Sequence, residues 1–315
     1  MSPQTLQAPS RKHRRLKPAP QQQIEKGDVP LYDLYDPRHF NLKSVDWVVL
    51  GWMSMIHIGA LAAPFYFTWQ AFVGMLVMHW ATCSIGICLG YHRFLSHKSL
   101  KLRQPARFLV TLCGVLSGEG SPLMWSATHR VHHARSDHHG DPHTPNDGSW
   151  WSHIIWLFMN HDKKCRDQLY RRYTPDLLKD RMLLFFEKTY GPMLFASGIA
   201  LYAFGGLPWL LWGLCFRMFF AYHSTWFVNS ATHIWGYRNY DTDDRSRNLW
   251  WVALLAYGEG WHNNHHAHPR LARAGHKWWE IDMTFYAIRV LQFVGLAYEV
   301  DDRKPVGRAA AVADE

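Results

Sequence analysis

Apolar residues in this chain are concentrated in four long stretches that occur as two pairs. The first pair covers about residues 45–69 and 71–92, and the second covers about residues 182–206 and 207–230. A helix needs roughly 20 apolar residues to cross the hydrocarbon core of a bilayer, and each stretch is about that long. The pattern therefore predicts an all-α integral membrane protein with four transmembrane helices arranged as two hairpins.

The distribution of basic residues predicts which side of the membrane the connections occupy. The short connectors at 68–70 and 205–208 contain no Lys or Arg, whereas the N-terminal tail, the segment 93–190 and the C-terminal segment contain nearly all of them. Because basic loops favour the cytoplasmic side, we expect both hairpins to enter from the cytoplasm and both termini to stay there. Four buried helices of one large soluble protein are the alternative interpretation.

The segments outside these stretches are expected to form two tails and a cap. Residues 1–43 are rich in Pro and Gln and predict a disordered basic cytoplasmic tail, and residues 301–315 form a short C-terminal tail. The remainder, 44–300, is expected to be one membrane domain. Two shorter apolar stretches, at 108–116 and 150–159, predict helices that lie in the membrane interface or re-enter it, because they are too short to span.

Composition refines this picture in three respects. The 17 Trp are many for 315 residues, and such amphipathic rings favour the membrane–water interface. The net charge of +9 fits attachment to anionic lipid head groups, and we expect no nucleic-acid partner because no domain supports one. The five Cys form no CxxC pair and predict reduced apolar fillers rather than disulfides or zinc knuckles.

Histidine is the residue type that carries the candidate chemistry. Three clusters follow or lie between the apolar stretches: "HRFLSH" (His92 and His97), "HRVHH" (His129, His132 and His133) and "HNNHH" (His262, His265 and His266). Residues at i, i+3 and i+4 of a helix share a face, so each HxxHH motif is expected to point three imidazoles the same way. Isolated histidines in apolar stretches, such as His57 and His79, are interpreted as packing residues.

Eight imidazoles from well-separated segments predict a metal centre with more than one ion. Packed together without a cation, they would desolvate one another and compete for protons. Zinc completes its coordination with about four ligands, whereas eight or more nitrogen donors suit two ions, and imidazole is a good ligand for iron. Only one Glu-x-x-His spacing occurs, from Glu259 to His262, so the centre is not the carboxylate-bridged type of soluble di-iron bundles.

These clusters, with their neighbouring "DPH" and "GEGW" residues, resemble the three histidine boxes of membrane fatty-acid desaturases, in the branch that contains stearoyl-CoA and cyanobacterial-type Δ9 enzymes. The resemblance runs from about residue 45 to 298. A fourth element, "WFVNSATHIWG" at 226–236, resembles the family segment that supplies one more ligand, here His233, and an Asn that holds a metal-bound water, here Asn229.

The resemblance implies two iron ions, O2 as co-substrate, and removal of two hydrogens from neighbouring carbons of a fatty acyl chain. It implies a cis double bond, with Δ9 as the expected position, and an acyl lipid or acyl thioester as substrate. Electrons would come from a separate donor, a ferredoxin or a cytochrome b5-like protein. Asp137, Asp141, His143 and Glu259 are the candidates for hydrogen bonds that orient the ligand imidazoles.

One departure from the family bears on the substrate. Animal acyl-CoA enzymes of this family have an Arg-Asp pair just before the second box, where this chain has Ala127 and Thr128. The change favours an acyl-lipid substrate of the bacterial type over an acyl-CoA. Arg217, in the middle of the fourth apolar stretch, is costly there and is expected to line the tunnel, stabilise helix packing or extend to the interface.

Two rival functions fit parts of the pattern. A related membrane di-iron hydroxylase would use the same histidine boxes, because hydroxylation and desaturation both begin with hydrogen abstraction. A metal transporter or haem protein is a more distant alternative. A transporter would place its ligands near the middle of the membrane, whereas nearly all these histidines lie outside the apolar stretches.

Overall fold

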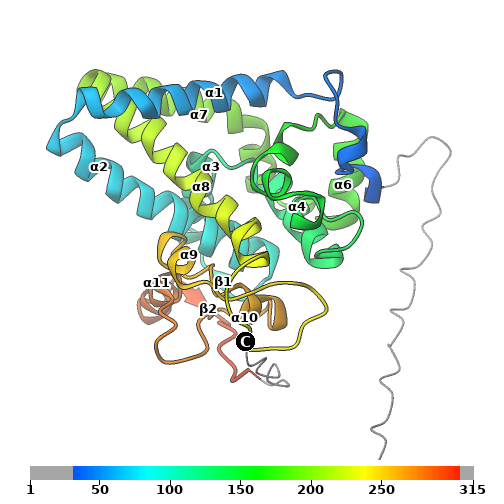
Figure 1. Cartoon of the computed structure of the whole chain (residues 1–315). Helices are drawn as coiled ribbons and strands as arrows, with labels where there is room; N and C mark the ends of the chain where they lie inside the picture. Colours follow the sequence, from blue (N-terminus) through cyan, green and yellow to red (C-terminus); the bar gives the residue numbers. More distant parts are fainter. Residues whose placement is uncertain (1–30, 306–315) are drawn as a thin grey trace, which may run out of the picture.

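The computed structural model describes residues 31–305, and this part of the chain is almost entirely helical (Figure 1). Its only strands are β1 (Lys101–Leu102) and β2 (Ala297–Tyr298), an antiparallel pair in which Lys101 is opposite Tyr298. The predictions for residues 1–30 and 306–315 lie outside the described residues. Residues 31–43 contain two short 3-10 helices, η1 (Leu31–Asp33) and η2 (Pro37–His39).

The first apolar pair forms two long helices that reverse direction at a short connector. Helix α1 (Trp47–Ala62) begins at Asp46, whose carboxylate accepts hydrogen bonds from the first backbone N–H groups, and continues as η3 (Ala63–Tyr66). Helix α2 (Trp69–His79) begins at Thr68 and continues without a break as the π-helix η4 (Trp80–Ser96). Both segments, 47–66 and 69–96, are long and apolar enough to cross a membrane.

The second apolar pair forms a third segment of this kind, 181–233. It comprises α7 (Arg181–Leu210), the π-helix η8 (Leu211–Phe216), α8 (Arg217–Asn229) and η9 (Ala231–His233). Gly205 and Gly206 depart from helical geometry, and the φ of +68° at Gly206 is one that glycine adopts easily. The chain turns back there, because Phe204 contacts Trp209 and the Gly198 backbone lies beside Leu214. This turn coincides with the predicted boundary between the third and fourth stretches.

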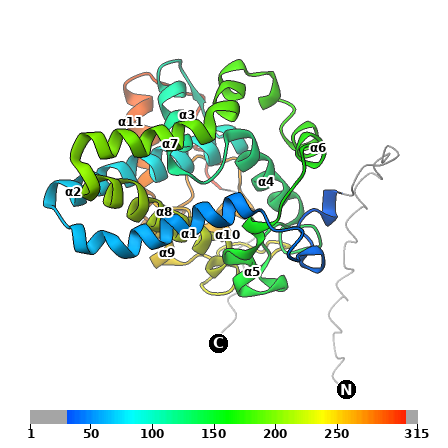
Figure 2. The same cartoon turned by 90° about the horizontal axis from the view of Figure 1, so that it is seen from above.

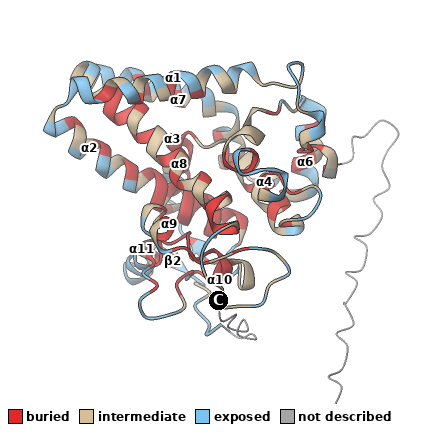
Figure 3. Ribbon diagram, viewed as in Figure 1, coloured by how far each residue is buried: buried red, intermediate tan, exposed pale blue. Residues whose placement is uncertain are grey.

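The residues through which the long helices contact one another are buried, whereas apolar side chains on their outer surfaces are exposed. Figure 3 shows the buried residues along the line where α2, η4 and α8 meet, with exposed positions along the outer side of α1. On α1 and η3, Ile58, Leu61 and Phe65 are 68%, 76% and 86% exposed. An apolar outer surface of this kind is typical of helices that face lipid.

Arg217 stabilises helix packing within this bundle. Its guanidinium donates to the Gly213 carbonyl, the Thr82 hydroxyl and the Leu116 carbonyl, and its side chain is buried. It therefore connects α8 with η4 and with α3 (Ala106–Ser117), the short apolar helix predicted at 108–116. Of the three roles considered for this residue, the contacts agree with packing.

The remaining helices form a cap at one end of the long helices, as Figures 1 and 2 show. Between the two helical pairs lie α4 (Pro122–Arg135), η5 (Pro145–Asp147), α5 (Ser149–His153), η6 (Ile155–Phe158), α6 (Lys163–Tyr173) and η7 (Leu177–Lys179). After the second pair come α9 (Trp250–Leu255), α10 (His262–Ala267) and α11 (Met283–Phe293). The pairing of β1 with β2 fixes the end of the cap beside the segment that follows η4.

Candidate metal centre

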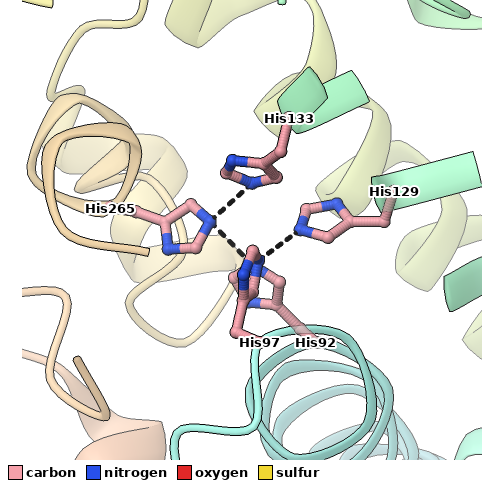
Figure 4. Close-up of side chains that lie close together, drawn as sticks. All are labelled: His92, His97, His129, His133 and His265. Atoms are coloured by element: carbon pink, nitrogen blue, oxygen red, sulfur yellow. Dashed lines mark hydrogen bonds between the residues drawn. The ribbon is translucent and has the colours of Figure 1, made fainter. Parts of the chain in front are cut away.

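Nine histidines gather in the cap as two groups. Cluster A contains His92, His97, His129, His133 and His265, and cluster B contains His132, His233, His262 and His266. Within each cluster the candidate ligand nitrogens all lie within 4.8 Å of one another. The structure therefore brings together all nine histidines that the sequence predicted as metal ligands, and Figure 4 shows cluster A.

The two HxxHH motifs each contribute to both clusters. On α4, His129 and His133 are one turn apart and enter cluster A, whereas His132 enters cluster B. On α10 the arrangement is reversed, because the pair one turn apart, His262 and His266, enters cluster B and His265 enters cluster A. The expectation that each motif points three imidazoles the same way is thus refined: the rings point toward one region but divide between two sites.

Other elements supply the remaining ligands. His92 belongs to the last turns of η4, and His97 follows this helix directly. His233 ends η9, the short turn after α8. The ends of both long helical segments therefore place ligands in the cap, where α4 and α10 meet them.

The ring nitrogens of each cluster face one another at short range. In cluster A, His97 Nε2 lies 2.7 Å from His129 Nε2, and His265 Nε2 lies 3.0 Å from His92 Nε2. In cluster B, His266 Nε2 lies 3.2 Å from His132 Nε2 and 3.0 Å from His262 Nε2. These nitrogens point inward, toward the centre of their own cluster.

Carboxylates contact the outer nitrogens of four of these rings. In cluster B, His132 Nδ1 is 2.9 Å from Asp141, His233 Nδ1 is 2.8 Å from Asp137, and His266 Nδ1 is 2.6 Å from Asp244. In cluster A, His92 Nδ1 is 2.8 Å from Glu259. A carboxylate at Nδ1 fixes the ring orientation and keeps the proton on that nitrogen, which leaves the Nε2 lone pair free for a metal.

This tautomer provides a test of whether the residues fit a metal. When neutral His132 and His266 donate from Nδ1 to Asp141 and Asp244, both Nε2 atoms present lone pairs to each other at 3.2 Å. The buried Nε2 of His233 has no hydrogen-bond partner. Two facing lone pairs repel, and an unpaired buried acceptor is costly, unless a cation lies between them. The donor set therefore fits metal ions, and nine imidazoles in two groups fit two of them.

Burial keeps most of these imidazoles in the neutral form that binds metal. It holds the pKa well below the usual value for His129, His133, His262 and His265, and it lowers the pKa of His266 to about 4. Burial acts in the same direction on His132, but the charge and hydrogen bond of Asp141 outweigh it and raise that pKa. A carboxylate thus has a strong electrostatic effect on the ring that it supports.

The predicted orienting residues all lie at the site, but in different ways. Asp137, Asp141 and Glu259 contact ligand rings directly. His143 instead packs against His132, with ring centroids 4.3 Å apart, and its Nδ1 is 4.0 Å from Asp141. Asn229 lines the cavity beside the clusters, and its predicted contact with a metal-bound water stays a prediction.

Sequence reasoning missed Asp244, which holds His266. This residue lies in the loop between η9 and α9, where Asp241, Asp243 and Asp244 are close together in the sequence. Its other carboxylate oxygen accepts from Thr242 and Ser246, and these bonds fix the loop around it. The neighbouring acids gave no signal that would have distinguished this one.

An apolar cavity lies next to both clusters. Cys83, Ile87 and Cys88 of η4 and Val228 of α8 line it, together with the ligands His92, His129, His132 and His262. Trp125 also lines the cavity and stacks on His129, with ring centroids 5.0 Å apart. The volume of this cavity is about 40 Å³, and its mostly apolar walls favour apolar groups beside the candidate metal ligands.

Glu119 is a further residue that the sequence did not single out. Its carboxylate accepts hydrogen bonds from Thr225 and Trp125, both of which line the cavity, and so connects α8 with α4 across it. Burial raises the pKa of Glu119 to about 8, although these hydrogen bonds act in the opposite direction. At neutral pH this group is mostly an uncharged acid.

A chain with long apolar helices and two buried imidazole clusters in a cap defines a class of membrane metalloprotein, and comparison with known proteins identifies the family. The fatty acid desaturase family model matches residues 67–298. This protein therefore belongs to the fatty acid desaturase family, as its histidine boxes predicted, and it is an oxidoreductase. The match includes all nine clustered histidines.

Individual relatives agree with this assignment. The chain is 41% identical over 272 residues to an sn-2 palmitoyl-lipid 9-desaturase of Nostoc, covering 86% of this chain and 95% of the relative. It is 44% identical over 258 residues to an sn-1 stearoyl-lipid 9-desaturase of Anabaena variabilis, covering 81% and 94%. An acyl-CoA 5-desaturase of Anemone leveillei is 39% identical over 293 residues, covering 89% and 88%.

Proposed function

We propose that this protein is an O2-dependent di-iron desaturase that introduces a cis Δ9 double bond into a saturated acyl chain of a membrane lipid. The observation that carries the proposal is the convergence of nine imidazoles, in two clusters, beside a cavity with apolar walls. The similarity to two lipid 9-desaturases supports the position of the double bond.

The chain's own residues hold, orient and shield the reacting groups. Iron, once bound, supplies with O2 the oxidising power for an unactivated C–H bond, which protein side chains lack. The clustered imidazoles would hold the two ions, and hydrogen bonds to Asp137, Asp141 and Asp244 keep three of the rings in place, while Glu259 lies 2.8 Å from a fourth, His92. The apolar cavity would position the acyl chain against cluster ligands and exclude water from it.

The surroundings of residues 127 and 128 favour an acyl lipid over an acyl-CoA. Ala127 is completely buried, and the Thr128 hydroxyl is 3.2 Å from the Tyr35 hydroxyl in the interior of the cap. Animal acyl-CoA enzymes of the family have a charged pair at these positions, and here the same positions are occupied by packed side chains. Relatives of both substrate types are similar to this chain, so analysis of the lipid class that carries the product tests the carrier directly.

The proposed topology has four membrane spans, two hairpins and a cytoplasmic cap. The reversal at Gly205 and Gly206 supports a division of the segment 181–233 into two spans. The basic residues that flank the hairpins support a cytoplasmic position for the cap and for both termini. A separate electron donor, a ferredoxin or a cytochrome b5-like protein, would then reach the metal centre from the cytoplasm.

Expression in a host that lacks unsaturated fatty acids tests the function. We expect a cis-Δ9 monoene in the host lipids, and its loss when His133 or His265 is replaced by Ala, because each is a cluster A ligand. The measurement is gas chromatography with mass spectrometry of the derivatised acyl chains. It locates the double bond in the chain and distinguishes a double bond from an added hydroxyl.

The matched control is His138→Ala, which removes an exposed histidine outside both clusters. This variant should retain wild-type product. A hydroxylated product from the wild-type protein would contradict the proposed desaturase activity and support the hydroxylase alternative. Full desaturation by His133→Ala or His265→Ala would exclude the ligand assignment.

A further inference from the structure

The two clusters differ in the negative charge that supports their ligands. In cluster B, three of the four imidazoles donate from Nδ1 to a carboxylate, at 2.9 Å for Asp141, 2.8 Å for Asp137 and 2.6 Å for Asp244. In cluster A, one imidazole of the five, His92, has a carboxylate of residues 31–305 at its Nδ1. The cluster with fewer nitrogen donors thus has more anionic support.

The negative charge of the three cluster B carboxylates acts on the imidazoles without a cationic side chain from the described part of the protein bound to the same carboxylates. Apart from the imidazoles, the groups that donate to them are backbone N–H groups and hydroxyls. Asp141 accepts from the N–H of Asp137, and Asp244 accepts from the hydroxyls of Thr242 and Ser246. Asp137 accepts from the N–H of Arg245 and the hydroxyl of Thr144. Neutral donors hold these carboxylates in position without cancelling their charge.

The single carboxylate of cluster A is shared with a cation. Glu259 Oε1 accepts from Arg93 Nη2 at 2.9 Å and from Arg93 Nε at 3.2 Å, and both residues are buried. The other oxygen of Glu259 is 2.8 Å from His92 Nδ1, but the two atoms lack hydrogen-bond alignment. Arg93 also pairs with the buried carboxylate of Asp282 at 2.9 Å, so Glu259, Asp282 and Arg93 together carry one net negative charge, against three in the carboxylates of cluster B.

We propose that the two metal positions are filled in a fixed order, with cluster B binding its ion first and more tightly than cluster A. A ligand imidazole that donates to a carboxylate is a stronger donor, and loss of such a partner typically lowers metal affinity about 10–100-fold. Interactions between charges are strong in a buried site, so three uncompensated carboxylates favour a divalent cation in cluster B. The fifth imidazole of cluster A adds a neutral donor and no charge.

This inference rests on the proposed two-metal centre and makes a separate statement about it. Protein that carries one metal ion per chain would hold the ion in cluster B. Such a protein would have an ordered half of the centre and an empty cluster A. The order of filling depends on the carboxylates around the rings, so it can be tested without any assay of the reaction.

The experiment is a titration of the full-length, metal-free protein in detergent micelles with Co²⁺, in competition with a chromophoric chelator. Co²⁺ binds imidazole and reports each site through its visible absorption. We expect two binding steps that differ in affinity at least ~10-fold. His262→Ala, which removes a cluster B ligand, should abolish or weaken the tighter step, and His97→Ala, which removes a cluster A ligand, should affect only the weaker one.

Charge-neutral variants test the physical cause. Asp141→Asn and Asp244→Asn remove the charge and keep one acceptor oxygen for the ring N–H, while the new NH2 group replaces the oxygen that accepts from Asp137 N–H or from the Thr242 and Ser246 hydroxyls. Each should weaken the tighter step about 10–100-fold. Glu259→Gln should change the weaker step alone. Asp167→Asn is the matched control, since this exposed acid pairs with Lys163 away from both clusters, and it should change neither step.

The outcomes separate the order of filling from the metal centre itself. Two steps of equal affinity in the wild type would overturn the order, and so would a tighter step that is lost in His97→Ala but kept in His262→Ala. Failure of the wild type to bind any Co²⁺, with helicity intact by circular dichroism, would instead contradict the two-metal centre of the proposed function.

Discussion

Glu119 is a buried titratable group that bonds Thr225 and Trp125, two residues of the cavity wall, and its protonation state bears on how that wall is held together. The protonated acid can still accept from Thr225 and Trp125 at low energetic cost. The ionised form would place a buried charge near Cys83, one of the residues that line the cavity.

Stability should therefore depend on pH through this residue. The folded pKa of about 8 lies above the usual value of roughly 4.3, so the folded protein retains a proton that the unfolded chain releases. The stability associated with this proton is complete below about 4.3 and is lost as the pH rises through about 8. Glu119→Gln keeps the acceptor but does not titrate, so we expect its Tm to exceed that of the wild type by ~3 °C or more at pH 8.5 and by less at pH 5.

Thermal unfolding in detergent at pH 5, 7 and 8.5 measures this difference. Asp167→Asn serves again as a control, because it changes an exposed carboxylate outside the cavity. A difference in Tm between Glu119→Gln and the wild type that stays constant across this range would show that Glu119 is ionised throughout.

Residue spacing predicted the metal ligands better than it predicted their supports. Six of the nine clustered histidines could be found because HxxHH motifs place donors about one turn apart, a local property of the sequence. His92 and His97 form a further local pair, whereas His233 was implied only by the resemblance to desaturases. Which ring joins which cluster depends on the angle at which α4 and α10 meet, and spacing carries no information about that angle. Asp244 contacts His266 from a loop 22 residues earlier in the chain, so only the folded structure reveals it.

Among the helices, η4 and α3 cross at very short range. A Cβ atom at Gly86 of η4 would lie 2.4 Å from the backbone of Cys113 and Gly114, and a Cβ at Gly114 would lie 2.4 Å from the Tyr91 ring. Small residues allow such close contact between helices, as is common in membrane proteins. This contact brings α3 against the helix that carries His92.

Gly86→Ala should therefore be strongly destabilising. The added methyl group would meet backbone atoms, which cannot rotate away, and we expect a loss of about 1–3 kcal/mol in the free energy of unfolding together with weaker metal binding at His92. Gly51→Ala is the control, since a Cβ at this α1 position meets no atom within 4 Å. Denaturant or thermal unfolding of both variants makes the comparison, and equal stability would contradict close packing at Gly86.

Helix existence could be predicted from the sequence, but helix type could not. Long apolar stretches require helices in a bilayer because every backbone group must be paired internally. The second stretch, however, changes from α2 to the π-helix η4 at Trp80 and ends at Ser96, beyond the predicted end at 92. A π-helix has a wider turn than an α-helix but can have the same apolar composition, so hydropathy does not distinguish the two helix types.

At the scale of the whole molecule, the clusters join segments that are distant in the sequence. Cluster A connects the end of η4 with α4 and α10, and cluster B connects α4 and α10 with the turn after α8. Bound metal ions would therefore cross-link both long helical segments through the cap. Ligand that binds only the folded state stabilises it by mass action.

Removal of the metal should lower the Tm of the whole protein. With metal at about 100 times its dissociation constant, each site adds roughly 2.7 kcal/mol, so we expect a decrease of several degrees on chelation and recovery when Fe²⁺ is restored. Differential scanning fluorimetry in detergent provides the measurement. The Tm of His133→Ala should decrease less on chelation than the Tm of the wild type. An unchanged wild-type Tm would mean that no structural cross-link forms.

The alternation of neighbouring histidines on α4 and α10 has a consequence for evolution and engineering. Each helix supplies both clusters from three histidines within about one turn, so a single inserted or deleted residue in either one would displace candidate ligands of both clusters at once. Variants in which only one cluster stays intact are therefore reached by point substitution and hardly ever by a shift of helical phase.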